Sequence, residues 1–215
     1  MLNVGLTGGI ACGKSTVAKM LVDCGAHLID FDLLAHNVQE PGKPAWQKVV
    51  DCFGKNILLP DGKIDRIKLG NIVFADPDKI RQLNEIVHPF VYQEWGERLE
   101  KIVRKENHAI VLSDVPLLFE GKKQHLFDLT LLILVEPEDQ IRRLMARNHI
   151  SGEEAQKRLN SQMPIAKKKE LADRVIDNRG SMAATGKLVK KIWRELMSLE
   201  KRKSKRESSD VKIKK

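Results

Sequence analysis

The chain starts with a short apolar run, an amphipathic helical segment and a second short apolar run. Residues 2–7 are mainly apolar up to two glycines, which predicts a buried β-strand. Residues 14–22 carry apolar side chains at helical spacing, and residues 27–30 predict a second strand. Strand, helix and strand in this order predict a βαβ unit, and therefore a parallel sheet with right-handed crossovers.

The second half of the chain continues this alternation. Apolar runs at residues 109–112, 129–135 and 175–176 predict three further strands. Three helices are predicted around them. The first covers residues 138–148, the second starts at the capping box of Ser151 and Glu154, and the third covers residues 182–199. The complete pattern predicts an α/β fold of three layers with a five-stranded parallel sheet.

The segment between the second and third strands is more polar and helical. Helices are predicted over residues 65–74, with Asp65 as the cap, and over about residues 76–103. We expect the second helix to be interrupted at His88-Pro89, since proline disfavours helix at and just before itself. The predicted organisation is a single domain, with a core of about residues 1–33 and 106–199 and an inserted helical lobe of about residues 34–105.

Composition narrows the class of protein. The 215 residues are 42% hydrophobic and 31% charged, as in globular proteins, and the apolar run 129–135 is too short to cross a membrane. Residues 1–4 predict a strand and not a signal peptide, because no basic region precedes an apolar stretch. Cys12, Cys24 and Cys52 lack metal-site spacing and an even pairing, so we expect a cytoplasmic protein without disulfides or zinc.

The net charge of +9 lies mostly in the last residues. Residues 200–215 hold eight Lys or Arg and three Asp or Glu, so they contribute +5. We expect this segment to be a disordered basic tail, with nucleic-acid binding as the alternative. The smaller positive excess of residues 1–199 suits polyanionic small molecules such as nucleotides.

The most informative motif is GGIACGKST at residues 8–16, a complete Walker A pattern between a predicted strand and a predicted helix. Its backbone N–H groups and the helix N-terminus would hold phosphate oxygens. Lys14 is expected to reach the β and γ phosphates, and the Ser15 hydroxyl to bind Mg²⁺. The other residues expected to contribute to ATP binding are Gly8, Gly9, Ala11, Cys12, Gly13 and Thr16. The chain is therefore predicted to be an ATP-using phosphoryl-transfer enzyme.

Carboxylates are predicted at the carboxyl ends of two strands, where open parallel sheets bind ligands. Asp30 and Asp32 follow the second strand, and either one could take a proton from an attacking hydroxyl or cap the next helix. They alternate along the chain, so we expect them to face opposite ways and only one to be catalytic. Asp114 follows the third strand and is a candidate to support Mg²⁺, with a cap or turn residue as the alternative.

Two arginines, Arg143 and Arg147, lie one helical turn apart and share a face. Arginines of this kind can clamp a transferring phosphate, although the spacing alone favours a solvated basic face.

The position of Cys12 in the loop suggests a further hypothesis, which concerns the reactivity of its thiol. A thiol near a helix N-terminus and beside Lys14 would have a lowered pKa and make the loop redox-sensitive, unless its side chain points into the protein.

The ordered set of segments resembles the dephospho-coenzyme A kinase family from Leu6 to about Leu199. Beyond the Walker A segment, the matching stretches are Asp30-Phe31-Asp32 with Ala35-His36, Asn84 to Pro89, Asp114 to Glu120, Gln140 with Arg143 and Arg147, Gln162, and Ala172 to Asn178. A Walker A pattern alone fits many kinases, whereas this ordered set is specific. The loop departs from the family pattern at Ala11-Cys12, where the family has Gly-Ser, and the basic segment after Leu199 has no counterpart.

The resemblance implies a P-loop NTPase fold whose lobe binds coenzyme A, with a lid at about residues 142–170. It implies transfer of phosphate from ATP, with Mg²⁺, to the ribose 3′-hydroxyl of dephospho-CoA, with Asp32 as the base and Arg143 or Arg147 as the lid arginine. The binding residues it implies are Asp32, His88, Pro89 and Leu117 for the acceptor, and Asn178 and Gly180 for ATP. Two alternatives remain for the function. The first is another small-metabolite or nucleotide kinase, and the second is a nucleotide-regulated nucleic-acid-binding protein.

Overall fold

The structure, a computed structural model, describes residues 1–213, with side chains described for residues 1–206. Within these residues one five-stranded sheet has the order β2-β3-β1-β4-β5. The strands are β1 (Leu2–Gly8), β2 (His27–Asp30), β3 (Ile110–Asp114), β4 (Leu129–Leu134) and β5 (Arg174–Asp177). β1 pairs in parallel with β3 and β4, and β4 pairs in parallel with β5. The predicted α/β fold is confirmed, and the central position of β1 places the loop after it in the middle of the carboxyl edge.

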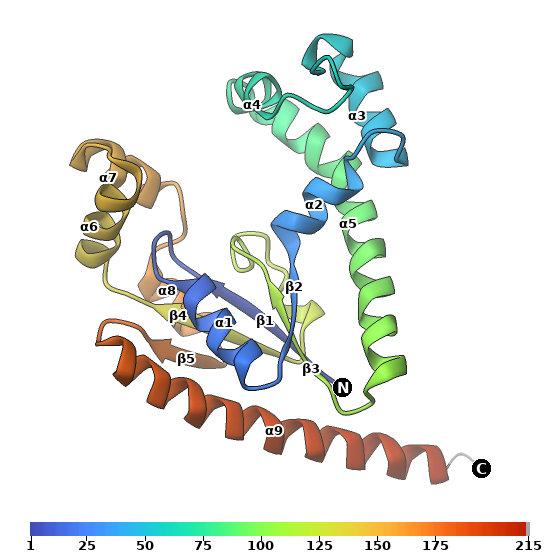
Figure 1. Cartoon of the computed structure of the whole chain (residues 1–215), viewed down its shortest axis with the longest axis vertical. Helices are drawn as coiled ribbons and strands as arrows, with labels where there is room; N and C mark the ends of the chain where they lie inside the picture. Colours follow the sequence, from blue (N-terminus) through green and yellow to red (C-terminus); the bar gives the residue numbers. More distant parts are fainter. Residues whose placement is uncertain (214–215) are drawn as a thin grey trace. The chain divides into compact units, whose positions relative to one another are not determined.

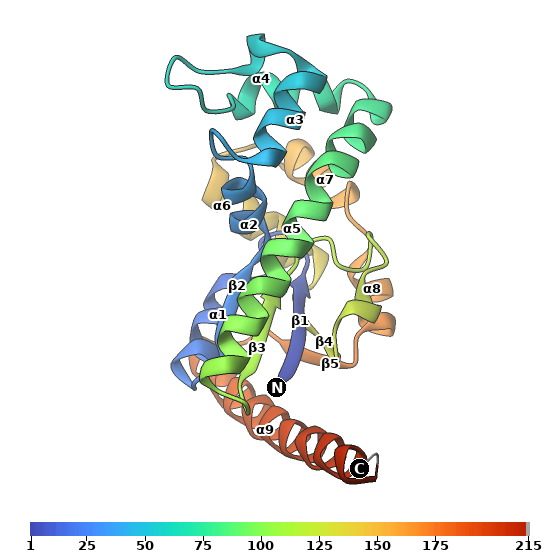
Figure 2. The ribbon, with the colours of Figure 1, turned by 90° about the vertical axis from the view of Figure 1, so that its right-hand side faces the viewer.

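The chain divides into two compact units: Met1–Ile29 with the described residues from Ile102 onward, and Asp30–Lys101. Helices cover both faces of the sheet in the first unit (Figures 1 and 2). They are α1 (Lys14–Asp23), α6 (Pro137–Asn148), α7 (Gly152–Asn160), α8 (Ile165–Leu171) and α9 (Met182–Ile213), with the short 3-10 helix η2 (Gln124–Leu126). Ser151 caps α7 by accepting from Glu154 N at 3.2 Å, which is one half of the predicted capping box, and the Glu154 carboxylate pairs with Arg158.

The two faces of the sheet are covered by different helices. On one face, Val17 of α1 and Val189 of α9 belong to the same buried cluster as Leu6 of β1. On the other face, Ile165 of α8 packs with Leu132 of β4. β1, β3 and β4 are buried along their whole lengths, which explains their nearly continuous apolar sequences. The three layers hold β1 rigidly up to the point where it enters the loop.

The second unit is helical. It contains α2 (Phe31–Val38), α3 (Pro44–Phe53), η1 (Lys55–Ile57), α4 (Arg66–Phe74) and most of α5 (Pro77–Lys105). Asp65 caps α4 as predicted, because its carboxylate accepts from Ile67 N and Lys68 N.

The predicted interruption at His88-Pro89 is wrong, because α5 continues through both residues to Lys105. Proline removes one main-chain N–H from a helix and crowds the preceding turn. Val87 and Val91, on either side of the proline, are nevertheless both buried. We infer that this packing outweighs the lost hydrogen bond and keeps the two halves in one helix.

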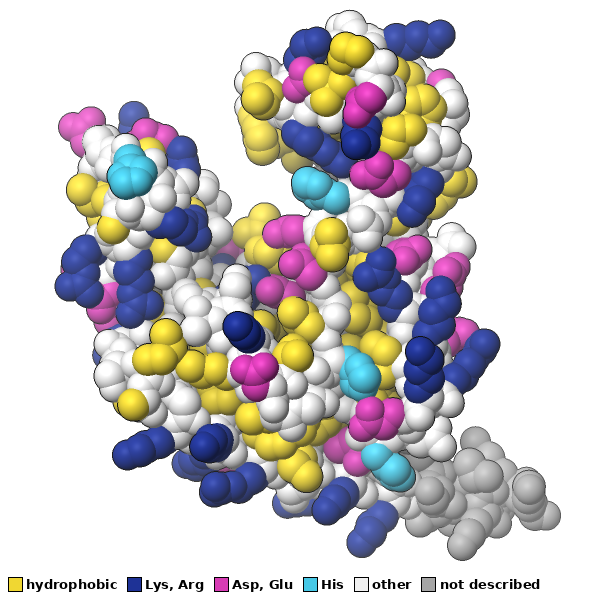
Figure 3. All heavy atoms as spheres, in the orientation of Figure 1, with side chains coloured by type: hydrophobic (Ala, Val, Ile, Leu, Met, Phe, Trp, Pro, Cys, Tyr) yellow, Lys and Arg dark blue, Asp and Glu magenta, His cyan; other side chains and the backbone are white. Residues whose placement is uncertain are grey.

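The last helix also differs from the prediction. α9 continues past Leu199 to Ile213, so the expected disordered tail is helical up to that residue. No glycine or proline follows Leu199 that would end the helix. Lys and Arg side chains follow the course of α9 along the lower edge of Figure 3. Lys214, Lys215 and the side chains from Glu207 onward lie outside the described residues.

Contacts with other residues of the first unit hold the first turn of α9 beyond Leu199. The Glu200 side chain is buried, and its Oε1 lies 3.0 Å from His108 Nδ1 and accepts from Ser204 Oγ at 2.6 Å. Lys203 Nζ pairs with Asp128 at 2.7 Å. The basic segment therefore begins as a docked helix and not as a solvated chain.

Replacing Glu200 with glutamine is expected to lower the free energy of unfolding at neutral pH by roughly 1–2 kcal/mol, since a buried charged acceptor is lost. Burial alone would raise the pKa of Glu200, but hydrogen bonds from Ser204 and His108 outweigh it and hold the pKa below its ordinary value. A carboxyl with a depressed folded pKa stabilises the protein above its unfolded pKa, and loses this effect as the pH falls through the folded value. Thermal unfolding should therefore show a Tm difference that shrinks as the pH falls below the ordinary pKa of a glutamate side chain; a constant difference would contradict this.

Candidate active site

The loop after β1 has the backbone of a phosphate-binding turn. Gly13 has a φ of 81°, in the left-handed region that glycine adopts without strain. Thr16 N and Val17 N donate to the Gly13 carbonyl at 3.1 and 3.2 Å, which forms the first turn of α1. The first N–H groups of a helix have no partner inside the helix and attract anions. The Walker A residues therefore stand in the context that the motif requires.

Ala11 is the strained residue of this loop. Its φ of 56° lies in the left-handed region, which costs a residue with a Cβ roughly 1–2 kcal/mol. Replacing Ala11 with glycine removes that strain but adds unfolded-state entropy worth about 0.4–1 kcal/mol. We expect Ala11→Gly to raise the free energy of unfolding by up to about 1 kcal/mol, measured by calorimetry. The control, Ala146→Gly on the exposed face of α6, should lose about 1 kcal/mol, and a loss at both positions would refute the strain argument.

Lys14 and Asp114 meet at the carboxyl edge of the sheet. Lys14 is the first residue of α1, Asp114 is the last residue of β3, and their side chains form an ion pair. Asp114 is 5% exposed and stands in register with Leu6, two residues before the loop begins. Ser15 follows Lys14 at the exposed start of α1. An ammonium, a hydroxyl and a carboxylate are thus brought to the start of one helix and the end of the neighbouring strand.

Cys12 lies under the loop and not on its surface. It is 2% exposed, and its Sγ occupies the space over Gly8, where a Cβ would collide with it. Burial raises the pKa of the Cys12 thiol, and this outweighs the lowering by the backbone N–H and the charge of Lys14. The expectation of a lowered pKa is therefore wrong, because the side chain points into the core, which is the alternative that the sequence left open.

Asn178 and Arg143 contact the other side of the loop. Asn178 Nδ2 donates to the Cys12 carbonyl at 2.8 Å, and a Cβ on Gly13 would collide with this amide. Arg143 Nη2 donates to the Asn178 carbonyl at 3.0 Å. Arg147 is exposed and donates to Asn148 Oδ1 at 2.8 Å. Of the two candidate arginines, Arg143 is the one whose contacts place it beside the phosphate-binding loop.

Gly180 lies two residues beyond Asn178, in the exposed turn before α9. The preceding residue, Arg179, pairs with Asp177, and its Nη1 lies 2.9 Å from Glu136 Oε1. The hydrogen bonds that Arg179 donates to the Asp177 carboxylate hold the pKa of Asp177 below its ordinary value. The turn that contains Asn178 and Gly180, the two further residues expected to bind ATP, is therefore held by charged pairs.

Three polar residues beside the loop received no functional role from the sequence. Gln140 is buried against Gly9, and its Nε2 donates to the Val135 carbonyl at 2.7 Å. Gln162 Oε1 accepts from Ile10 N at 2.9 Å, and the third residue, Lys168, is fully buried. A cavity of about 420 Å³ is lined by Gly9, Gln140 and Gln162, among others. The family resemblance includes both glutamines, but Lys168 is hidden in the run of three lysines at 167–169.

In the helical unit, the two candidate carboxylates have different positions. Asp30 is the N-cap of α2, because its Oδ1 accepts from Leu33 N at 3.0 Å. Asp32 lies in the first turn of α2 and is exposed. The preceding residue, Phe31, packs on Trp95 of α5 with ring centroids 5.5 Å apart. The cap and this ring contact fix the helical turn that carries Asp32.

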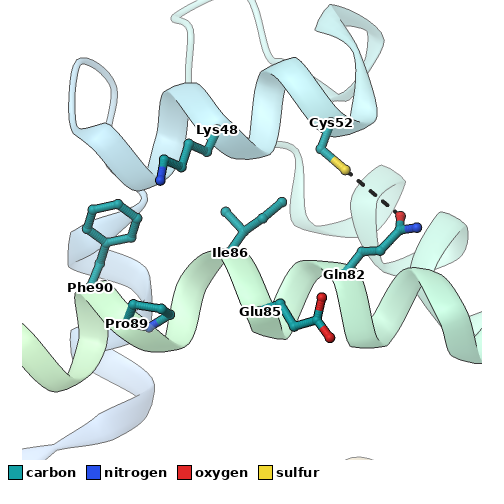
Figure 4. A pocket seen from close by; sticks show the side chains of 7 residues that line it. All are labelled: Lys48, Cys52, Gln82, Glu85, Ile86, Pro89 and Phe90. Atoms are coloured by element: carbon teal, nitrogen blue, oxygen red, sulfur yellow. Dashed lines mark hydrogen bonds between the residues drawn. The ribbon is translucent and has the colours of Figure 1, made fainter.

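The helical unit also contains a pocket of about 310 Å³ (Figure 4). Lys48 and Cys52 from α3 face a row of side chains from α5 across it, which are Gln82, Glu85, Ile86, Pro89 and Phe90. His88 packs against Tyr92, with ring centroids 6.1 Å apart. Of the residues expected to bind the acceptor, Pro89 lines this pocket. Leu117, in the turn after β3 of the first unit, is 52% exposed.

A parallel sheet with a Walker A loop between its central strand and α1 places this protein among the P-loop NTPases. A family model described as dephospho-CoA kinase matches residues 2–184. The dephospho-CoA kinase of Syntrophus aciditrophicus is 52% identical over 201 residues, covering 94% of this chain and 86% of the relative. The Carboxydothermus hydrogenoformans enzyme is 50% identical over 182 residues, covering 85% and 88%. The chain belongs to the dephospho-CoA kinase family, and the alternatives gain no support.

Solved structures agree with this assignment. A crystal structure of a Thermus thermophilus protein matches with a TM-score of 0.78 and 33% identity, covering 91% of this chain and 97% of that protein. The dephospho-CoA kinase of Campylobacter jejuni matches with a TM-score of 0.69 and 31% identity, with the same coverage.

The part of the chain that the structure describes holds neither a membrane-spanning helix nor a metal-binding cluster of side chains. No helix in this part of the chain has both the length and the apolar character needed to cross a membrane. Nor do three or more His, Cys, Asp or Glu side chains in it gather into a group that could hold a metal ion.

Proposed function

We propose that this protein transfers the γ-phosphoryl group of ATP to the ribose 3′-hydroxyl of dephospho-CoA, giving coenzyme A and ADP. The observation that carries the kinase assignment is the glycine loop that ends at Lys14, with Asp114 beside it at the carboxyl edge of the sheet. Family membership supports dephospho-CoA as the acceptor.

The loop would hold the phosphates of ATP through its N–H groups and the Lys14 ammonium. In this proposal Arg143 adds positive charge beside the loop, and Asn178 and Gly180 border the adenine. Arg143 and Asn178 are supported by their contacts with each other and with the loop. The residues of the first unit would thus supply binding and orientation for the phosphoryl donor.

Ser15 and Asp114 are the proposed ligands for Mg²⁺. A hydroxyl and a carboxylate are oxygen donors of the kind that Mg²⁺ prefers, and Mg²⁺ in kinases takes few protein ligands besides the phosphates. Asp114 already lies against a cation, the Lys14 ammonium, so the carboxylate suits a positively charged neighbour. When bound, Mg²⁺ neutralises charge on the β and γ phosphates.

Asp32 is the proposed base. It would take the proton of the 3′-hydroxyl as the new oxygen–phosphorus bond forms and the bond between the γ phosphorus and the bridging oxygen breaks. His88, Pro89 and Leu117 are the proposed acceptor-binding residues. Support within the helical unit is the fixed first turn of α2 and the pocket that Pro89 lines.

We also propose a cytoplasmic location, where both ATP and the acceptor are available. The three cysteines are free thiols in the structure, which fits a reducing compartment.

An ADP-release assay with a panel of acceptors tests the proposed function. The expected result is turnover with dephospho-CoA, with 3′-phosphorylated product identified by mass spectrometry. Nucleoside monophosphates and small hydroxylated metabolites should give only the background rate. Turnover with one of these compounds and none with dephospho-CoA would refute the proposed acceptor while leaving the P-loop assignment intact.

A further inference from the structure

Lys168 is a fully buried lysine on α8, with 0% of its side chain exposed. Its Nζ lies 2.7 Å from Glu120 Oε1 and donates to the Gly8 carbonyl at 3.3 Å. Burying an ammonium group costs several kcal/mol of solvation, which a single ion pair seldom recovers. The ion pair with Glu120 is therefore a weak explanation for a lysine at this position.

The hydrogen bond from Lys168 acts on the backbone at Gly8. It is the last residue of β1 and the first residue of the Walker A segment, so the chain leaves the sheet at this point. A free peptide group could rotate here and would change the direction of the following N–H groups. The Lys168 ammonium fixes the Gly8 carbonyl and so limits that rotation.

A second contact from the same segment acts on the same loop. Gln162, six residues before Lys168, accepts from Ile10 N at 2.9 Å. Glu120 Oε1 accepts from Met163 N at 3.0 Å, so it holds the segment from the other side. Residues 162–168 thus contact the loop at Gly8 and at Ile10, and Glu120 holds the segment itself.

We infer that Lys168 is a positioning residue for ATP binding, which sets the start of the phosphate-binding loop through the Gly8 carbonyl. This inference rests on the proposed ATP site. It assigns the residue no contact with the substrate. Its consequence is that removing the ammonium group should disorder the loop and weaken MgATP binding, while the acceptor is bound as before.

The test is calorimetric titration of MgATP into the full chain, together with steady-state kinetics. Lys168→Met keeps the apolar stem and removes the charge. The dissociation constant and KM for MgATP should each rise about tenfold or more, the effect expected for a lost charge-assisted hydrogen bond. KM for dephospho-CoA should stay within about twofold. If Lys168→Met folds and binds MgATP within twofold of the wild type, the inference is overturned.

Two control variants separate positioning from stability and from general charge. Lys167→Met removes the same charge from an exposed position on α8 and should leave MgATP binding unchanged. Glu120→Gln keeps an acceptor for Lys168 and for Met163 N, so MgATP binding should stay within about threefold. An equal loss of affinity in Glu120→Gln and Lys168→Met would assign the effect to the ion pair and overturn the inference.

The variant Lys168→Met with Glu120→Gln removes both charges, which is often neutral for stability, and covers the case in which Lys168→Met alone does not fold. It should melt near the wild-type temperature and still bind MgATP about tenfold more weakly. Wild-type affinity in this variant would overturn the inference. A wild-type protein that binds no MgATP would refute the proposed function instead, so the two failures are distinguishable.

Discussion

Replacing Lys14 with alanine is expected to lower kcat/KM by roughly 10²–10³-fold, the range found when one preorganised charge-stabilising donor is removed. Lys14 is the ammonium group at the start of α1, and its partner Asp114 fixes its position at the carboxyl edge. No other described lysine occupies that position. The measurement is ADP release with saturating dephospho-CoA, with the Tm recorded for each protein.

Lys19→Ala is the matched control, because Lys19 is an exposed lysine on the same helix. It should retain wild-type kinetics. A Lys14→Ala protein with kcat/KM near the wild-type value would remove the P-loop assignment, since the ammonium would then have no function in transfer.

Asp32→Asn should retain MgATP binding and lose roughly 10²–10⁴-fold in kcat, the range for a general base. Asparagine has nearly the same shape, so the first turn of α2 should be kept while the proton acceptor is lost. Single-turnover measurements with preformed complexes would separate the chemical step from product release.

Asp30→Asn is the control for this change. Asp30 is the N-cap of α2, and asparagine caps a helix about as well as aspartate. We therefore expect Asp30→Asn to change kcat by less than about threefold. If Asp30→Asn proves more damaging than Asp32→Asn, the choice of base is wrong.

The sequence predicted the sheet and the loop because their signals are local. A buried parallel strand is apolar along its length, and Gly13 is required by a left-handed backbone that the Walker A pattern encodes. The choice between Asp30 and Asp32 as helix cap depended on where α2 begins. The strand prediction alone could not give that boundary, because a helix start is set by a single hydrogen bond to Leu33 N.

The sequence analysis failed at positions where tertiary contacts determine the conformation or the burial of a residue. Pro89 remains inside α5 because residues on both sides of it are buried, which no local pattern contains. Glu200 looked like part of a solvated tail, yet it is buried beside His108, a residue 92 positions away. Lys168 received no prediction, because it lies in the sequence between two lysines that the structure shows to be exposed. Each of these cases needs the fold before the side chain can be placed.

Pro89 links the stability of α5 to the wall of the pocket in the helical unit. Because proline has no N–H, the carbonyl oxygen of Glu85, four residues earlier, cannot receive the helical hydrogen bond that this position normally donates. Glu85 and Pro89 both line the pocket of the helical unit. The helix therefore gives up one main-chain hydrogen bond beside this pocket. A substitution at Pro89 that restored this hydrogen bond would also replace part of the pocket wall, so helix and pocket cannot be altered independently at this position.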